Sequence, residues 1–267
     1  MRVALYLGRI EDLEFAKTIV DYLNHAGFEV YAFRDYETKY LSVKKFQNKD
    51  VEYSIVIGGD GTLLRYIHDI NEELLQIPIL HIGTGRVNYL CDVEKEQALE
   101  AIKDLIHRKY IIDERELLRV RTRTSRSYFL NEVLVRNEDL GKLITVSIYE
   151  ANDCEIITAR MDGVIIATPT GSTAYSLSAG GSVIDLRVKA KIITPLAPFS
   201  RSIPSVVHPL EVPLRIISQE QALIICDGVK IWSDKEVLIS YEGDKVKLLR
   251  TRKYNYYLRF RKRILML

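Results

Sequence analysis

Residues Gly58–Thr62, with the sequence GGDGT, constrain the fold of this chain more than any other segment. They follow the apolar run Ser54–Ile57, which predicts a short buried strand, and they precede residues 63–67, whose apolar side chains recur at helical spacing. Glycines at a strand-to-helix turn leave backbone N–H groups accessible to an anion. The carboxylate of Asp60 is then expected at the carboxyl end of a strand, where open α/β sheets bind ligands. This arrangement predicts a phosphate-handling α/β domain, whereas an Asp-Gly pair alone would indicate only a turn.

Composition limits the classes of protein to which the chain can belong. Its 267 residues suit two domains, and 47% hydrophobic with 28% charged residues is ordinary for a globular protein. A net charge of +2 is too small to favour nucleic acid or a membrane surface as a partner. Three cysteines without metal-ligand spacing, together with no visible targeting segment or apolar span, predict a cytoplasmic protein with reduced thiols.

The chain changes character near residue 115. Before that point strands and helices alternate, which predicts a parallel sheet covered by helices. The expected strands are 2–7, 28–33, 54–57 and 77–82, and the expected helices are 12–26, 63–75 and 96–108. After that point strand patterns dominate, which predicts a β-rich domain. The expected strands there are 117–123, 127–136, 143–150, 155–159, 163–167, 213–218, 221–226, 236–240 and 245–250.

We therefore expect an α/β domain with a parallel open sheet at residues 1–115 and a β-rich domain at residues 116–250. Residues 251–267 mix aromatic, basic and apolar side chains and are expected to return to the first domain.

Two adjacent polar residues, Asn131 and Glu132, interrupt an apolar strand pattern. Neighbouring residues of a strand point to opposite faces, so at least one of the two is expected to face the core. Leaving a buried polar group without a partner costs about 1–3 kcal/mol, which favours a ligand-binding role. A solvated pair at the rim of a sheet is the alternative.

A second cluster covers residues 162–181, where an apolar strand runs into a proline–glycine break and a series of small hydroxyl residues. Small side chains let a planar ligand reach the backbone, and the ring of Tyr175 could stack on it. A helix start capped by Ser172 or Thr173 is the structural alternative.

A third glycine-containing loop follows the strand that ends at Ile82, and Arg86 or Tyr89 could line a ligand there. Residues 83–89 lack the third glycine of a dinucleotide fingerprint. The sequence contains neither a Walker A motif nor the kinase HRD and DFG motifs. A phosphoryl transferase with this sequence would therefore belong to neither large class.

These separated blocks resemble the NAD kinase family over most of the chain. The Gly58–Thr62 loop is similar to the family's GGDGT, and Asn131–Glu132 to its Asn-Glu pair. Residues 162–176 resemble its longest motif almost letter for letter, and residues 194–198 and 227–228 resemble two further blocks. The GGDGT loop alone is also similar to loops of diacylglycerol, sphingosine and 6-phosphofructokinases, so the block at 162–176 separates these possibilities.

The resemblance implies phosphorylation of the adenosine-ribose 2′-hydroxyl of NAD by ATP or polyphosphate, with Asp60 as general base. It implies that Gly61 lets the pyrophosphate or ribose approach, and that Asn131 and Glu132 bind ribose hydroxyls. The remaining candidate substrate-binding residues are Arg65, Tyr89, Lys142, Arg160, Asp162, Thr173, Ala174, Tyr175 and Ser178.

The same resemblance implies a sandwich-like second domain, Mg²⁺ or another divalent metal accompanying the phosphate donor, and a homodimer or homotetramer. The chain departs from the family pattern at Val87–Tyr89, where Leu-Gly-Phe is frequent, and at Val229, where Gln is frequent. Two alternatives remain: a lipid or sugar kinase with the same loop, and a non-enzymatic regulator that binds a dinucleotide.

Overall fold

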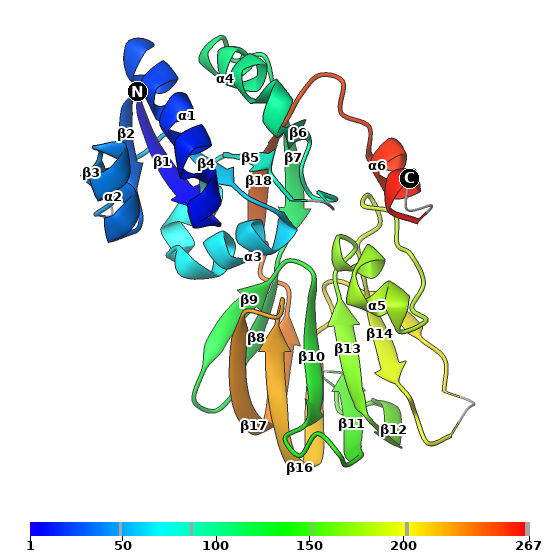
Figure 1. The fold of residues 1–267 in the computed structure, drawn as a ribbon. Coiled ribbons are helices and arrows are strands. Elements are labelled where there is room, and N and C mark those ends of the chain that lie inside the picture. The colour runs from blue at the N-terminus through cyan, green and yellow to red at the C-terminus, as the bar shows by residue number, and fades with distance from the viewer. Residues whose placement is uncertain (48–49, 86–87, 151, 201–202, 265–267) are drawn as a thin grey trace. The chain divides into compact units, whose positions relative to one another are not determined.

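The computed structural model describes residues 1–47, 50–85, 88–150, 152–200 and 203–264 (Figure 1). Contacts within the chain divide it into two compact units, residues 1–114 with 246–267, and residues 115–245. The first unit contains a parallel sheet flanked by helices, and the second contains an antiparallel sheet. The expected fold class is therefore confirmed.

The sheet of the first unit has the strand order β3-β2-β1-β4-β5-β18-β7, and β6 also pairs with β5. Strands β1 and β4 pair in parallel, as do β4 and β5, and β5 and β18. All five residues of both β4 and β5 are buried, as expected for parallel strands covered on both faces, and Ser54 and His81 are the polar residues among them. The strands are β1 (Arg2–Leu7), β2 (Glu29–Ala32), β3 (Lys44–Lys45), β4 (Tyr53–Ile57), β5 (Ile79–Gly83), β6 (Val93–Glu94), β7 (Ile111–Glu116) and β18 (Lys245–Arg250).

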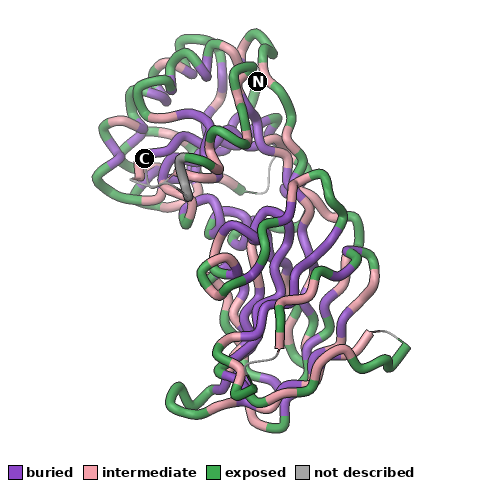
Figure 2. The backbone as a smooth tube through the Cα atoms, turned by 90° about the vertical axis from the view of Figure 1, so that its right-hand side faces the viewer, coloured by how far each residue is buried: buried purple, intermediate pink, exposed green. Residues whose placement is uncertain are grey.

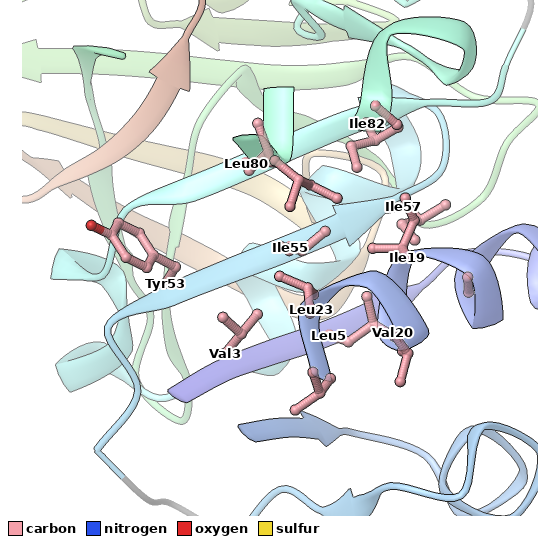
Figure 3. Close-up of a cluster of buried hydrophobic side chains, with 14 of the residues drawn as sticks. Val3, Leu5, Ile19, Val20, Leu23, Tyr53, Ile55, Ile57, Leu80 and Ile82 are labelled. Atoms are coloured by element: carbon pink, nitrogen blue, oxygen red, sulfur yellow. The ribbon is translucent and has the colours of Figure 1, made fainter. Parts of the chain in front are cut away.

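Helices cover both faces of this sheet. Leu5 and Ile55 belong to one core cluster with residues of α1 (Leu13–His25) and α4 (Ala98–Ile106). Figure 3 shows Ile19, Val20 and Leu23 of α1 in this cluster beside the strands. Tyr6 and Ser54 alternate with these core residues and contact Tyr66 of α3 (Asp60–Asp69), so α3 lies on the opposite face. The remaining helices are α2 (Asp35–Leu41), α5 (Tyr175–Ser178) and α6 (Tyr256–Ile264), and the short 3-10 helices are η1 (Ile10–Asp12), η2 (Glu72–Gln76), η3 (Lys95–Gln97) and η4 (Gly171–Thr173).

The second unit is built on antiparallel strands in the order β15-β14-β13-β10-β16-β17-β8-β9. One half of the long strand β16 pairs with β11 and the other half with β10, so the sheet branches there. Side chains from β10, β11 and β13 share one buried core. Figure 2 shows buried stretches of backbone within each unit and exposed residues in the peripheral loops. The strands are β8 (Leu118–Arg121), β9 (Arg126–Phe129), β10 (Glu132–Asn137), β11 (Ile144–Glu150), β12 (Glu155–Met161), β13 (Gly163–Ala167), β14 (Ala190–Leu196), β15 (Val206–Pro209), β16 (Leu214–Cys226) and β17 (Lys230–Ser240).

Several expected elements differ from the structure, among them the strands expected at 213–218 and 221–226, which form the single strand β16. The helix expected at 63–75 ends at Asp69, because Ile70 is extended, and a 3-10 helix follows. The strand expected at 127–136 is broken into β9 and β10 around Asn131. Residues 245–250 were expected in the β-rich domain, but β18 pairs with β5 in the first sheet. An apolar strand pattern in the sequence does not indicate which sheet the strand joins.

Two further facts concern the described part of the chain. The segment 250–259 contacts residues of the first unit, including a hydrogen bond from Arg259 to the Asp92 carbonyl. Among the described residues, no helix has the length and apolar character needed to cross a membrane.

Candidate active site

The Gly58–Thr62 loop joins β4 to α3 at the carboxyl end of the first sheet. Gly58 has a φ of 154°, and a Cβ atom there would lie 2.3 Å from the Thr62 Oγ1. A Cβ atom at Gly8, at the end of β1, would meet the same oxygen at 2.3 Å. Glycine is therefore required at both positions so that Thr62 can pack between neighbouring strand ends.

Asp60 is the first residue of α3, and two backbone amides orient its half-buried carboxylate. The Tyr89 N–H donates to Oδ2 at 2.8 Å and the Leu90 N–H donates to Oδ1 at 3.0 Å. An ionised carboxylate accepts hydrogen bonds on both oxygens and can take up a proton from a substrate hydroxyl. The arrangement suits a base with a fixed orientation.

The other described candidate residues of the first unit lie on α3 and in the loop whose amides bind Asp60. Gly61 and Arg65 are exposed on α3, and the Arg65 Nη2 donates to the Thr62 Oγ1 at 3.3 Å. Tyr89 is half-buried, with its ring centroid 6.5 Å from that of Tyr256. Its hydroxyl has no hydrogen-bond partner among the described residues. The candidate Arg86 lies outside the described residues.

His81 supports the same loop, a role that the sequence analysis missed. Its Nε2 lies 3.0 Å from the Gly58 carbonyl oxygen, and burial lowers the pKa of the imidazole to about 4. The ring is therefore neutral near pH 7, which allows an N–H donor toward that carbonyl. Its place in an apolar strand is the only local signal, and that signal does not distinguish a core histidine from a supporting one.

In the second unit, a bend at Leu130–Glu132 separates β9 from β10, and the Asp227 carboxylate accepts hydrogen bonds from the backbone of this bend. Asp227 accepts the backbone N–H groups of Leu130, Asn131 and Glu132 at 2.9, 2.8 and 3.1 Å. Asp227 itself has a φ of 51° in the turn after β16. The sequence analysis noted Asp227 only as part of the block at 227–228. It did not predict these hydrogen bonds, because the partners of Asp227 lie 95 to 97 residues away.

Glu132 has an unusual environment. Its Oε2 is buried without a hydrogen-bond partner among the described residues. Burial and, to a smaller extent, the charge of the Asp227 carboxylate raise the pKa of the Glu132 carboxyl to about 8, although the Tyr175 N–H opposes the shift. A buried carboxyl with an unused oxygen can bind a ligand hydroxyl without losing a protein partner.

The segment 168–178 packs directly on this bend. The Thr168 N–H donates to the Asn131 carbonyl at 2.9 Å, and a Cβ atom at Gly171 would lie 1.9 Å from that carbonyl oxygen. The structure therefore brings the Asn131–Glu132 pair beside the small-residue segment, as the Tyr175 amide near Glu132 also shows. Thr173 is buried, Ala174 is half-buried, and the side chains of Tyr175 and Ser178 are exposed.

Three candidates lie elsewhere in the second unit. β10 and β13 are antiparallel, with Glu132 opposite Ala167 at one end and Arg136 opposite Gly163 at the other. Asp162 therefore lies at the end of the strands away from Asn131 and Thr168. Lys142, in the loop after β10, pairs with Asp139 at 2.8 Å. Exposed Arg160 pairs across strands with Thr145 near the same end. Within one chain, Lys142, Arg160 and Asp162 do not join the Asn131–Glu132 group.

The described residues contain no group of three or more His, Cys, Asp or Glu side chains that could bind a metal ion. Asp60 offers one carboxylate, which suits a divalent cation held mainly by substrate phosphates.

Comparison with known proteins identifies the family. Residues 9–110 match the ATP-NAD kinase N-terminal domain, and residues 130–251 match the ATP-NAD kinase C-terminal domain. The chain is 30% identical over 266 residues to the NAD kinase of Lachnoclostridium phytofermentans, covering 92% of each chain. It is 36% identical over 231 residues to that of Pyrococcus abyssi, covering 82% of this chain and 81% of the relative.

Solved structures agree in fold. Yeast NADH kinase complexed with NADH matches with a TM-score of 0.88 at 19% identity, over 100% of this chain and 88% of that one. An NAD kinase from Archaeoglobus fulgidus in complex with ATP matches with a TM-score of 0.82 at 24% identity, over 100% of both chains. At these identities the structural likeness establishes the fold, while the sequence relatives establish the family. This chain therefore belongs to the NAD kinase family.

Proposed function

We propose that this chain phosphorylates the adenosine-ribose 2′-hydroxyl of NAD to give NADP, with ATP or polyphosphate as donor. The observation that carries the proposal is the family match over both units, from the GGDGT loop to the segment at 162–176. A lipid or sugar kinase with a similar loop would leave that second segment without a role.

In the proposed reaction, a carboxylate oxygen of Asp60 accepts the proton of the 2′-hydroxyl as the ribose oxygen attacks the terminal phosphorus of the donor. The bond between that phosphorus and the bridging oxygen breaks, and ADP or shortened polyphosphate leaves. A general base contributes about 10²–10⁴-fold, and orientation and charge neutralisation supply much of the rest. Mg²⁺ or another divalent cation would enter with the donor and neutralise charge on its phosphates.

The remaining roles follow from the groups described above. Asn131 and Glu132 are proposed to bind ribose hydroxyls, and Thr173, Ala174 and Tyr175 to bind the adenine with Ser178 nearby. Gly61 would allow close approach of the pyrophosphate or ribose, with Arg65 and Tyr89 as further substrate contacts. The last proposed substrate-binding residues are Lys142, Arg160 and Asp162. Because these three lie at the other end of the β10 and β13 strands, a second copy of the chain would have to supply them in the proposed dimer or tetramer.

The proposal is tested by incubating the pure protein with NAD or NADH, with ATP or polyphosphate, and with Mg²⁺. NADP is then detected with an NADP-specific dehydrogenase, and NADPH by its own fluorescence after chromatography. We expect NADP from NAD with at least one donor. Absence of product with every donor and acceptor would contradict the proposal.

Two further assays distinguish the proposed function from a lipid or sugar kinase and from a non-enzymatic regulator. Phosphorylation of a diacylglycerol, sphingoid base or fructose phosphate would support the rival kinases, and calorimetric NAD binding without turnover would support a regulator. Sedimentation would give the proposed oligomer, and cell fractionation would test the proposed cytoplasmic location.

A further inference from the structure

The loop at residues 89–92 is bound on two sides, and only one of them is Asp60. The N–H groups of Tyr89 and Leu90 donate to the Asp60 carboxylate. On the other side, the Leu90 carbonyl accepts a hydrogen bond from the Arg250 Nη1 at 2.5 Å. The Asp60 carboxylate is thus oriented by a loop that is itself bound by a residue 160 positions away in sequence.

Arg250, the last residue of β18, is a buried cation with incomplete pairing. Its side chain is 1% exposed, and its Nε donates to the Asp113 Oδ2 at 2.8 Å. The guanidinium carbon lies 4.4 Å from the centre of the Tyr254 ring. Its Nη2 is buried and has no hydrogen-bond partner among the described residues. Such a buried charge contributes little to stability by itself, because its hydrogen bonds offset only part of the free energy lost on desolvation.

The chain beyond β18 adds two more bonds to the same loop. The Thr251 N–H donates to the Asp92 Oδ2 at 2.6 Å. The Arg259 Nη2 donates to the Asp92 carbonyl at 2.7 Å, and its Nη1 lies 3.4 Å from Glu94. Residues 250–259 therefore bind the carbonyls of Leu90 and Asp92 and the Asp92 side chain.

These contacts converge on a segment outside any helix or strand. In such a loop the direction of each amide depends on external bonds, whereas in a helix neighbouring turns would fix it. Bonds to the Leu90 and Asp92 carbonyls fix the peptide planes that follow Leu90 and Asp92. They hold the chain directly after the Tyr89 and Leu90 amides, which limits the positions that these amides, and with them the Asp60 carboxylate, can take.

We propose that Arg250 and Arg259 are positioning residues, through which the segment 250–259 fixes the loop at 89–92 and so the orientation of the Asp60 carboxylate. The catalytic part of this inference rests on the proposed function. A misplacement of about 1 Å at a reacting group can cost roughly 10²-fold in rate, so loosening the loop should lower kcat and leave substrate binding nearly unchanged.

The experiment compares Arg250→Lys, Arg259→Ala and Arg259→Lys with the wild type in the full chain. Hydrogen exchange with mass spectrometry follows the peptide that contains Tyr89 and Leu90, and steady-state assays give kcat and both KM values. Lysine at 259 keeps one donor for the Asp92 carbonyl and serves as the conservative variant. Lys191→Met is the matched control, because it removes a 1% exposed cation from the second unit, whereas the loop belongs to the first.

We expect Arg259→Ala to exchange several-fold faster in that peptide, with kcat lowered about tenfold and each KM within about twofold. Arg250→Lys should behave likewise, Arg259→Lys should recover most of kcat, and Lys191→Met should leave exchange in the peptide unchanged. Faster exchange with unchanged kcat, or a lower kcat with unchanged exchange, would overturn the inference.

Arg259 is partly exposed, so its variants remain informative where Arg250→Lys fails to fold. If the wild type makes no NADP, the proposed function fails by itself. Exchange in Arg259→Ala then decides the inference about the loop: faster exchange supports it and unchanged exchange overturns it.

Discussion

At Asp60, one side chain is oriented by two amides and is proposed to accept a proton. Asp60→Asn replaces one acceptor oxygen with an NH2 group, which cannot accept the amide hydrogen bond and cannot act as a base. We expect kcat to fall by about 10²–10⁴-fold while NAD binding, measured by calorimetry, is retained. Asp69→Asn, at the other end of α3, is the control and should keep kcat. Undiminished turnover in Asp60→Asn would remove Asp60 from the base role.

The raised pKa of Glu132 predicts that the stability of the protein depends on pH. Its pKa is raised from 4.5 to about 8 in the folded protein, mainly by burial. Between these values the folded protein retains a proton that the unfolded chain has released. The stability due to this proton is therefore complete below about pH 4.5 and is lost as pH rises to about 8.

Glu132→Gln keeps the neutral shape at every pH. We expect its free energy of unfolding, relative to the wild type, to rise between pH 4.5 and 8 by up to about 1.4 kcal/mol per pH unit. Urea unfolding at several pH values across this window measures it. Glu138→Gln, an exposed position on the same segment, should show no such trend. A difference that is independent of pH would show that Glu132 is ionised in the folded protein.

At the scale of elements, Gly171 decides whether η4 can pack on the bend at Asn131. Because a Cβ atom would overlap the Asn131 backbone, Gly171→Ala should displace that bend and lower stability by about 1–3 kcal/mol, with weaker NAD binding. Gly141→Ala is the matched control, since its nearest atom, the Asp139 Oδ1, would be 3.7 Å away. Thermal unfolding and NAD titration measure both effects. Equal stability of the two variants would contradict this account.

Elements with a strong local pattern were predicted from sequence, and elements with mixed patterns were not. The continuous apolar runs of β4 and β13 and the amphipathic α1 matched their expected positions closely. β14 was missed because Lys191 and Pro195 interrupt its apolar pattern. The Lys191 ammonium is nevertheless buried, donating to the carbonyls of Pro209, Leu210 and Val212, and the pKa of Lys191 is lowered to about 8 by desolvation.

At the scale of the whole molecule, the two units differ in how the chain builds them. Residues 115–245 form a contiguous unit, whereas residues 1–114 need β18 from the end of the chain. We expect a fragment of residues 115–245 to unfold cooperatively in urea and a fragment of residues 1–114 not to. Joining residues 245–267 to the fragment of residues 1–114 through a flexible linker should make that fragment unfold cooperatively. A cooperative transition in residues 1–114 alone would contradict this expectation.

The sequence by itself determined the fold class, the strand–glycine–helix turn that presents Asp60, and the family to which the chain belongs. The fold class and the turn depend on residues that are close together in the chain, where spacing and side-chain type are sufficient, and the family depends on several such local blocks. Tertiary structure alone decided that Asp227 binds the bend at Asn131, that β18 completes the first sheet, and that Arg250 reaches the loop beside Asp60. These contacts join residues about 95 to 170 positions apart, so no local pattern of polarity or propensity records them.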